Sequence, residues 1–115
     1  MRKLLDFVQV DAFTRQPLFG NPAAVVFDAD EIPVATMQKI AREMNLSETV
    51  FLLKPTSPEA DYRVRIFTPM NELPFAGHPT VAAAHSVVSR YPEMAGVTLL
   101  RQECGIGIVP VKVIP

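Results

Sequence analysis

The sequence predicts an α+β domain in which a mixed β-sheet wraps around a single apolar α-helix. Several short segments are rich in Val, Ile, Leu and Phe, and eleven prolines in 115 residues punctuate the expected turns between them. This spacing favours many short elements over a helical bundle. Within 81–88 the apolar residues lie all around the helix and not on one stripe, which is typical of an enclosed helix. Strands and helices do not alternate regularly, so a nucleotide-binding α/β fold is not expected.

The first part of the chain predicts two strands and an amphipathic helix. Leu4–Phe13 alternates loosely and predicts a strand, and the Pro- and Gly-rich Thr14–Pro22 predicts a loop. Ala23–Phe27 has no polar member and predicts a strand buried on both faces. Asp28–Pro33 supplies the acidic residues and the proline that commonly precede a helix. The helix itself, Val34–Met44, has apolar residues at i, i+3, i+4 and i+7, namely Met37, Ile40, Ala41 and Met44.

The second part predicts four strands and the central helix. Thr49–Leu53 is a short apolar strand, and Asp61–Thr68 alternates fully, which indicates one packed and one partly wet face. The central helix begins at about Gly77–His78–Pro79, because proline suits a first helical turn, and it ends near Tyr91. The last two strands are expected over Val97–Arg101 and Ile106–Val113, separated by Glu103, Cys104 and Gly105.

Composition excludes several classes of protein. The length of 115 residues allows one domain at most. The net charge is −1 and the basic residues are scattered, so nucleic acid is not an expected partner. No apolar run approaches the roughly 20 residues that a membrane span requires, and Asp6 and Asp11 interrupt the N-terminal segment, which argues against a secretory signal. The single Cys104 forms no internal disulfide, as is typical of cytoplasmic proteins.

Glu48 is the first candidate for chemistry. It lies at a junction between helix and strand, beside Ser47, and the apolar residues of 49–53 follow it at once. A carboxylate at the edge of such a segment is partly withdrawn from water, which favours a role in proton transfer. The alternative is an ordinary surface glutamate at the start of a strand.

His78 is the second candidate, at the start of the central helix. The exposed N–H groups of a helix start favour an anion, most simply a carboxylate, and Gly77 lets it approach the backbone closely. His78 could then donate a hydrogen bond or pass on a proton. The alternative is a capping or structural histidine. Gly77, with Ser47 and Pro79 beside the two candidates, is the expected substrate-binding set.

Other site types find little support. His78 and His85 are seven residues apart without a carboxylate or thiol at ligand spacing, so a metal site is not expected, and His85 is expected to be packed or on the surface. Cys104 has no histidine close by in sequence and is expected to be inert. Gly105 and Gly107 are not followed by a helix and do not form a phosphate loop. A serine nucleophile elbow is also absent from the sequence.

Three separate segments carry a family resemblance. They are Gly20–Val25 (GNPAAV), Asn45–Phe51 (NLSETVF) and the stretch from Arg65–Pro69 (RIFTP) through Glu72–Thr80 (ELPFAGHPT). Together, and in this order, they closely resemble the phenazine-biosynthesis (PhzF-like) isomerase family. The resemblance covers nearly the whole chain but only the N-terminal half of the family pattern.

The resemblance implies a fold and a chemistry. The fold is similar to that of diaminopimelate epimerase, in which two similar domains each wrap a sheet around a helix and the active site lies between them. Family members are cofactor-free isomerases that move a proton between two carbons of a small carboxylic acid. By position, Glu48 matches the acid and base, His78 the histidine beside it, and Gly77 the backbone cradle for the substrate carboxylate.

Ala76 bears on the type of reaction that the resemblance implies. In the related proline-racemase and diaminopimelate-epimerase families, a cysteine precedes the matching glycine and works with a second thiol. Cys104 matches neither thiol. A racemase is therefore the weakest of three readings, behind a carboxylate-driven isomerase and a non-catalytic binding or assembly domain with the same fold.

The chain differs from the family pattern in its length. Full members are more than twice as long, and their second half completes the cleft, so residues 1–115 are expected to form one N-terminal domain with half an active site. The face that carries Glu48 and His78 would then be unpaired, and we expect a homodimer, aggregation or pairing with a second domain. A small carboxylate is the expected substrate, and its identity does not follow from the sequence.

Overall fold

The computed structural model describes residues 5–12 and 21–113. They form seven strands, two α-helices and one 3₁₀ helix, η1. In chain order the elements are β1 (Phe7–Ala12), β2 (Asn21–Val26), α1 (Val34–Met44), β3 (Glu48–Leu53), β4 (Tyr62–Phe67), β5 (Glu72–Leu73), α2 (Gly77–Arg90), η1 (Pro92–Met94), β6 (Leu99–Cys104) and β7 (Gly107–Lys112).

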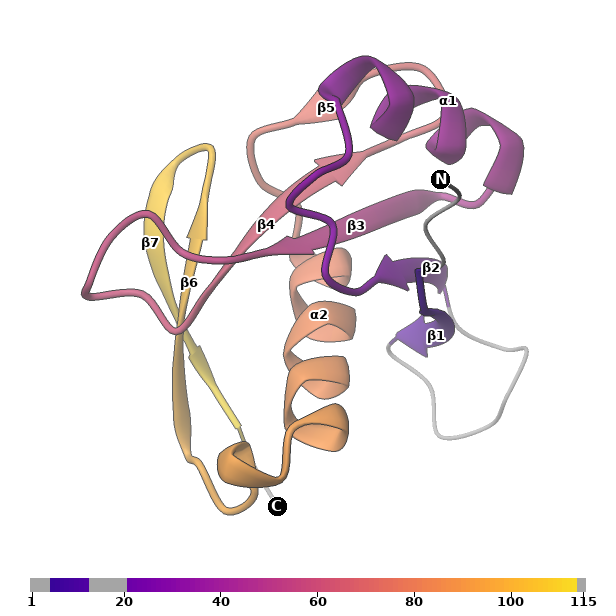
Figure 1. The fold of residues 1–115 in the computed structure, drawn as a ribbon. Coiled ribbons are helices and arrows are strands. Elements are labelled where there is room, and N and C mark those ends of the chain that lie inside the picture. Colours follow the sequence, from indigo (N-terminus) through magenta and orange to yellow (C-terminus); the bar gives the residue numbers. More distant parts are fainter. Residues whose placement is uncertain (1–4, 13–20, 114–115) are drawn as a thin grey trace.

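The strands form one mixed sheet in the order β1-β2-β3-β4-β6-β7, with the short β5 paired to β4. The β2–β3 and β4–β6 pairs are parallel and the other pairs are antiparallel. Within β4, only Tyr62 and Arg63 at the start of the strand pair with β6, while Ile66 and Phe67 at its end pair with β5. Because β6 shares so little of β4, the β6–β7 hairpin diverges from the rest of the sheet and passes along one side of α2, opposite β1 and β2 (Figure 1). The predicted α+β class is confirmed.

The two faces of the sheet carry separate cores, as the alternation of side chains along a strand requires. On β3, Val50 and Leu52 face α2, whereas Phe51 faces α1. The ring of Phe51 meets Phe67 edge to face, with 5.5 Å between the ring centroids. The α2 side has the larger core, in which buried residues of β2, β3, β4 and β6 surround Ala82, Ala83, Ala84 and Val87.

The central helix is less enclosed than expected. Ala82, Ala83 and Ala84 are buried in the core between the helix and the strands. Val81, however, is 44% exposed, and His85 is exposed as well. The reason is the strand order: β1 and β7 are the two edges of the sheet, and they flank α2 without meeting across it. His85 is thus on the surface, which is one of the two alternatives expected from the sequence.

Most expected elements form, with shifted ends. The expected loop over 14–22 lies largely outside the described residues, as do residues 4 and 13 at the ends of the first expected strand, and β2 begins two residues earlier than expected, at Asn21. The expected separation of the last two strands at Glu103 and Cys104 is wrong, because both residues pair with β7 around a tighter turn. Neither β5 nor η1 was expected.

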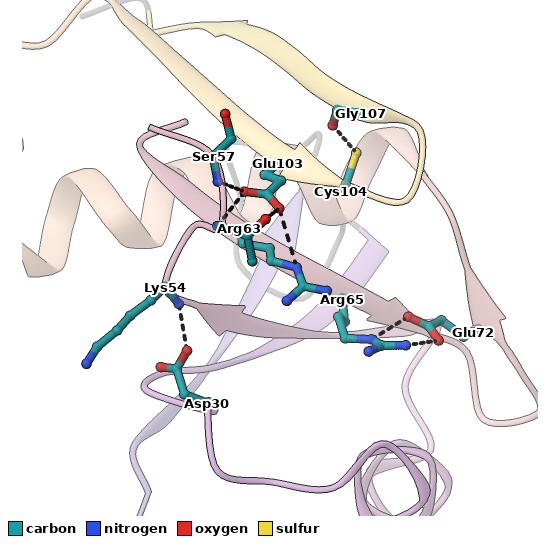
Figure 2. A network of polar contacts seen from close by, with 10 residues as sticks. Asp30, Lys54, Ser57, Arg63, Arg65, Glu72, Glu103, Cys104 and Gly107 are labelled. Carbon is teal, nitrogen blue, oxygen red and sulfur yellow. Dashed lines mark hydrogen bonds and ion pairs between the residues drawn. The ribbon is translucent and has the colours of Figure 1, made fainter. Parts of the chain in front are cut away.

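Polar contacts explain why the start of α1 differs from the expected one, and they also tie β5 to β4. Pro33 holds the N-cap position of α1, and the Asp30 carboxylate accepts the backbone N–H of Lys54 at 2.8 Å (Figure 2). Arg65 donates two hydrogen bonds of 2.8 Å to Glu72 and so ties β5 to β4. Hydrogen bonding to the Glu72 carboxylate raises the pKa of the Arg65 guanidinium. Before α1, the contact of Asp30 with Lys54 thus overrides the local helix-start pattern.

Candidate active site

Glu48 and His78 meet at the first turn of α2. Glu48 begins β3, and the period of two places it on the same face as Val50 and Leu52, which pack in the core around α2. His78 is the second residue of α2. As a result, Glu48 Oε2 lies 2.9 Å from His78 Nε2.

The environment of this pair suits proton transfer. The side chains of Glu48 and His78 are 13% and 12% exposed, so both are largely withdrawn from water but still reachable. The two facing atoms, Oε2 and Nε2, are themselves buried. At 2.9 Å a carboxylate and an imidazole can share one proton, so either group can hold a proton that the other releases.

The start of α2 offers backbone donors beside the pair. Ala76 is the N-cap residue, is extended, and makes no capping hydrogen bond through its side chain. A Cβ atom built on Gly77 would meet nothing within 4 Å, so the space beside this residue is open. The N–H groups of a first helical turn have no partners within the helix and stabilise negative charge. An anionic group fits this place chemically.

The remaining expected residues have different surroundings. Ser47 is exposed and directly precedes β3, next to Glu48. Pro79 is fully buried, so in this structure its ring contributes to packing and to the helix start and does not face open space. The Cys104 thiol lies 3.5 Å from the carbonyl oxygen of Gly107, within the β6–β7 hairpin. Ala76 leaves no thiol at the N-cap.

Sequence reasoning missed the roles of two buried polar residues, Thr80 in the first turn of α2 and Gln102 of β6 packed against it. Gln102 of β6 is 0% exposed, and its Nε2 donates to Thr80 Oγ1 at 3.2 Å. Thr80 Oγ1 in turn donates to the carbonyl oxygen of Ala76 at 2.8 Å. A signal was present in the sequence: Leu100 and Gln102 are two residues apart on one strand, so the polar residue takes an inward position.

Two kinds of feature are absent from the described part of the chain. Over residues 5–12 and 21–113, no group of three or more His, Cys, Asp or Glu side chains is arranged to hold a metal ion. Within the same ranges, neither helix is long and apolar enough to cross a membrane.

Comparison with known proteins identifies the family of the chain. Residues 10–114 match the family model described as phenazine biosynthesis-like protein (PhzC-PhzF). The chain belongs to this family. It is 61% identical over 79 residues to the trans-2,3-dihydro-3-hydroxyanthranilate isomerase of Pseudomonas fluorescens, an alignment that covers 69% of this chain and 28% of that protein. It is 48% identical over 108 residues to antisense-enhancing sequence 1 of Schizosaccharomyces pombe, which covers 93% of this chain and 36% of that protein.

Solved structures agree with the fold. The chain superimposes on the PhzF-family phenazine biosynthesis protein of Bacillus anthracis with a TM-score of 0.87 and 36% identity, over 98% of this chain and 37% of that one. A hydroxyproline epimerase from Agrobacterium vitis, at 15% identity and a TM-score of 0.61, shares the fold alone. The chain therefore spans about a third of the length of these relatives.

Proposed function

We propose that this chain is the N-terminal domain of a cofactor-independent isomerase, in which Glu48 moves a proton between two carbons of a small carboxylic acid. A second domain, outside these 115 residues, would complete the cleft. His78 relays the proton or orients the substrate. Gly77 and the start of α2 hold the substrate carboxylate, with Ser47 at the rim of the site.

The contact between Glu48 and His78 carries this proposal. A carboxylate 2.9 Å from an imidazole, both largely buried, beside open space at a helix start, combines a proton carrier with an anion site. The isomerase names of several family relatives agree with such a site. Ala76 favours carboxylate chemistry over a two-thiol racemase.

The proposed reaction balances without an external oxidant or reductant. The Glu48 carboxylate accepts a proton from one carbon, and the electron pair of the broken C–H bond enters the π system of the substrate. The double bond shifts, and the displaced π pair takes the same proton from Glu48 at a second carbon. Glu48 ends as it began, ionised, with no net change in the enzyme.

The test uses the complete protein that contains this chain, with trans-2,3-dihydro-3-hydroxyanthranilate as the probe substrate in D₂O. We expect Glu48→Gln, which keeps the shape but cannot carry the proton, to lower isomerisation and deuterium incorporation by roughly 10²-fold or more. NMR of the substrate measures both. Glu43→Gln, a change of the same kind on the exposed face of α1, is the control and should behave as wild type. Normal exchange in Glu48→Gln would remove Glu48 from the mechanism.

A non-catalytic binding or assembly domain is the second candidate. One observation favours it: antisense-enhancing sequence 1, which aligns over 93% of this chain, has a name that describes no reaction. This alternative predicts that Glu48→Gln and His78→Ala change neither turnover nor ligand affinity. The isomerase proposal predicts loss of turnover in both variants.

A further inference from the structure

Gln102 is a fully buried polar side chain. It lies on the inner face of β6, two residues from the fully buried Leu100. Its Nε2 makes one hydrogen bond, to Thr80 Oγ1, and within the described residues its Oε1 has no hydrogen-bond partner. A buried carbonyl oxygen without a partner is costly. An apolar side chain of similar volume would avoid that cost, so the amide is a local loss of stability of the kind that functional positions show.

The hydrogen bond leads directly to the candidate site. Thr80 Oγ1 accepts from Gln102 and donates to the Ala76 carbonyl, which also accepts the Thr80 backbone N–H at 3.4 Å. Ala76 and Thr80 are the N-cap and fourth residues of α2, and they enclose His78 between them. A link from β6 therefore holds the single turn on which His78 stands.

The end of the same strand makes a second link. The backbone N–H of Gly105 donates to the carbonyl oxygen of Pro74 at 3.0 Å, just before the segment that enters α2. A Cβ on Gly105 would lie 2.7 Å from Pro74 Cα, so the two backbones are in close contact. Both the approach to α2 and its first turn are thus attached to β6, while Glu48 is attached to β3.

We propose that Gln102 is a positioning residue: through Thr80 it holds the first turn of α2 so that His78 stays within hydrogen-bond distance of Glu48. The inference rests on the proposed function of that pair, but its geometric part can be tested without turnover. Gln102 acts through Thr80 and does not itself touch the substrate.

The test follows two NMR signals of the complete protein that contains this chain, the amide exchange rate of Thr80 and the cross-relaxation between the His78 ring and the Glu48 side chain. Gln102→Met removes the hydrogen bond at nearly constant volume. We expect it to speed Thr80 exchange about fivefold, the effect of one lost buried hydrogen bond, and to weaken the His78–Glu48 signal at least about twofold. Thr80→Val should act in the same way, and Thr80→Ser, which keeps the hydroxyl, should restore both signals.

Two controls separate positioning from general loosening. Ser86 Oγ donates to the Ala82 carbonyl at 2.8 Å, the same i to i−4 bond on the same helix without a link to β6, so Ser86→Ala should leave both signals unchanged. Because Gln102 acts through the hydroxyl, the double variant Thr80→Val/Gln102→Met should match Thr80→Val alone. Equal changes in Ser86→Ala, unchanged signals in Gln102→Met, or additive effects in the double variant would each overturn the inference. If Gln102→Met does not fold, equal NMR signals in Thr80→Val and Thr80→Ser would also overturn the inference.

Turnover of the complete protein distinguishes the two proposals. If both hold, Gln102→Met should lower kcat/KM, because the turn that it loosens carries both His78 and the Gly77 backbone cradle. If Glu48→Gln keeps full activity while Gln102→Met still moves the NMR signals, the proposed function fails and the structural link stands. If Glu48→Gln is inactive but Gln102→Met changes nothing, only the positioning role fails.

Discussion

At the scale of single residues, the site depends on which small groups are absent as much as on which charges are present. Gly77 begins α2 with open space where a Cβ would lie, and Ala76 has no thiol at the N-cap. Glu48 and His78 stand beside that space. A residue that adds one methyl group without disturbing the fold can therefore test whether the open space is used.

Gly77→Ala is that change. Because its Cβ meets nothing within 4 Å and alanine favours helix more than glycine, the free energy of unfolding should stay constant or rise by up to about 1 kcal/mol. The methyl would occupy the place proposed for the substrate carboxylate, so kcat/KM of the complete protein should fall about tenfold or more, a loss of about 1.4 kcal/mol. Urea unfolding and steady-state kinetics measure the two effects. Unchanged kinetics in a stable variant would show that no substrate group lies against Gly77.

At the scale of elements, the β6–β7 hairpin holds the entry to α2. Its turn contacts the segment between β5 and α2 through the Gly105–Pro74 hydrogen bond. The hairpin also encloses one flank of α2 in Figure 1. Since β6 pairs with only two residues of β4, this contact is an important part of what fixes the hairpin against the rest of the molecule.

Gly105→Ala should accordingly destabilise the fold. The new Cβ would lie 2.7 Å from Pro74 Cα and 3.0 Å from its carbonyl oxygen, so a backbone has to move. Overpacking of this kind costs about 1–3 kcal/mol, which urea unfolding would register as a lower midpoint. Gly77→Ala is the matched control, because the same chemical change meets open space there. Equal midpoints for the two variants would contradict the close contact.

At the scale of the whole molecule, the sheet is open. Among the described strands, β1 and β7 each have one unpaired edge, and both lie beside the exposed face of α2. Large apolar side chains are exposed near these edges, namely Phe7, Val8, Ile106 and Ile108. Such edges and patches promote association.

We therefore expect the isolated 115-residue chain to self-associate, and sedimentation velocity should show dimers or larger species that grow with concentration. Val8→Lys and Ile108→Lys place a charge beside each edge and should shift the population towards monomer. Lys39→Arg, on the exposed face of α1, keeps its charge and serves as the control. A single species of monomer mass at high concentration would contradict this expectation.

Much of the fold follows from local patterns. The alternation in β4 and the one-sided apolar face of α1 appear in the structure as expected, because both are set by burial of neighbouring residues. The structure differs from the sequence predictions where contacts between residues far apart in the chain determine the local structure. Glu103 remains part of β6 because it pairs with β7, and the Asp30 carboxylate accepts the backbone N–H of Lys54. Neither partner can be inferred from the residues next to them in the sequence.

The sequence by itself determined the fold class, the approximate elements, the family resemblance and the choice of Glu48 and His78, because side-chain periodicity, helix-start chemistry and motif spacing are local properties. Only the tertiary structure decided that Glu48 Oε2 and His78 Nε2 lie 2.9 Å apart, that α2 is open on one side, and that Gln102 reaches Thr80. These features depend on which strands are neighbours and how far the sheet curves. Both are set by packing between segments far apart in the chain.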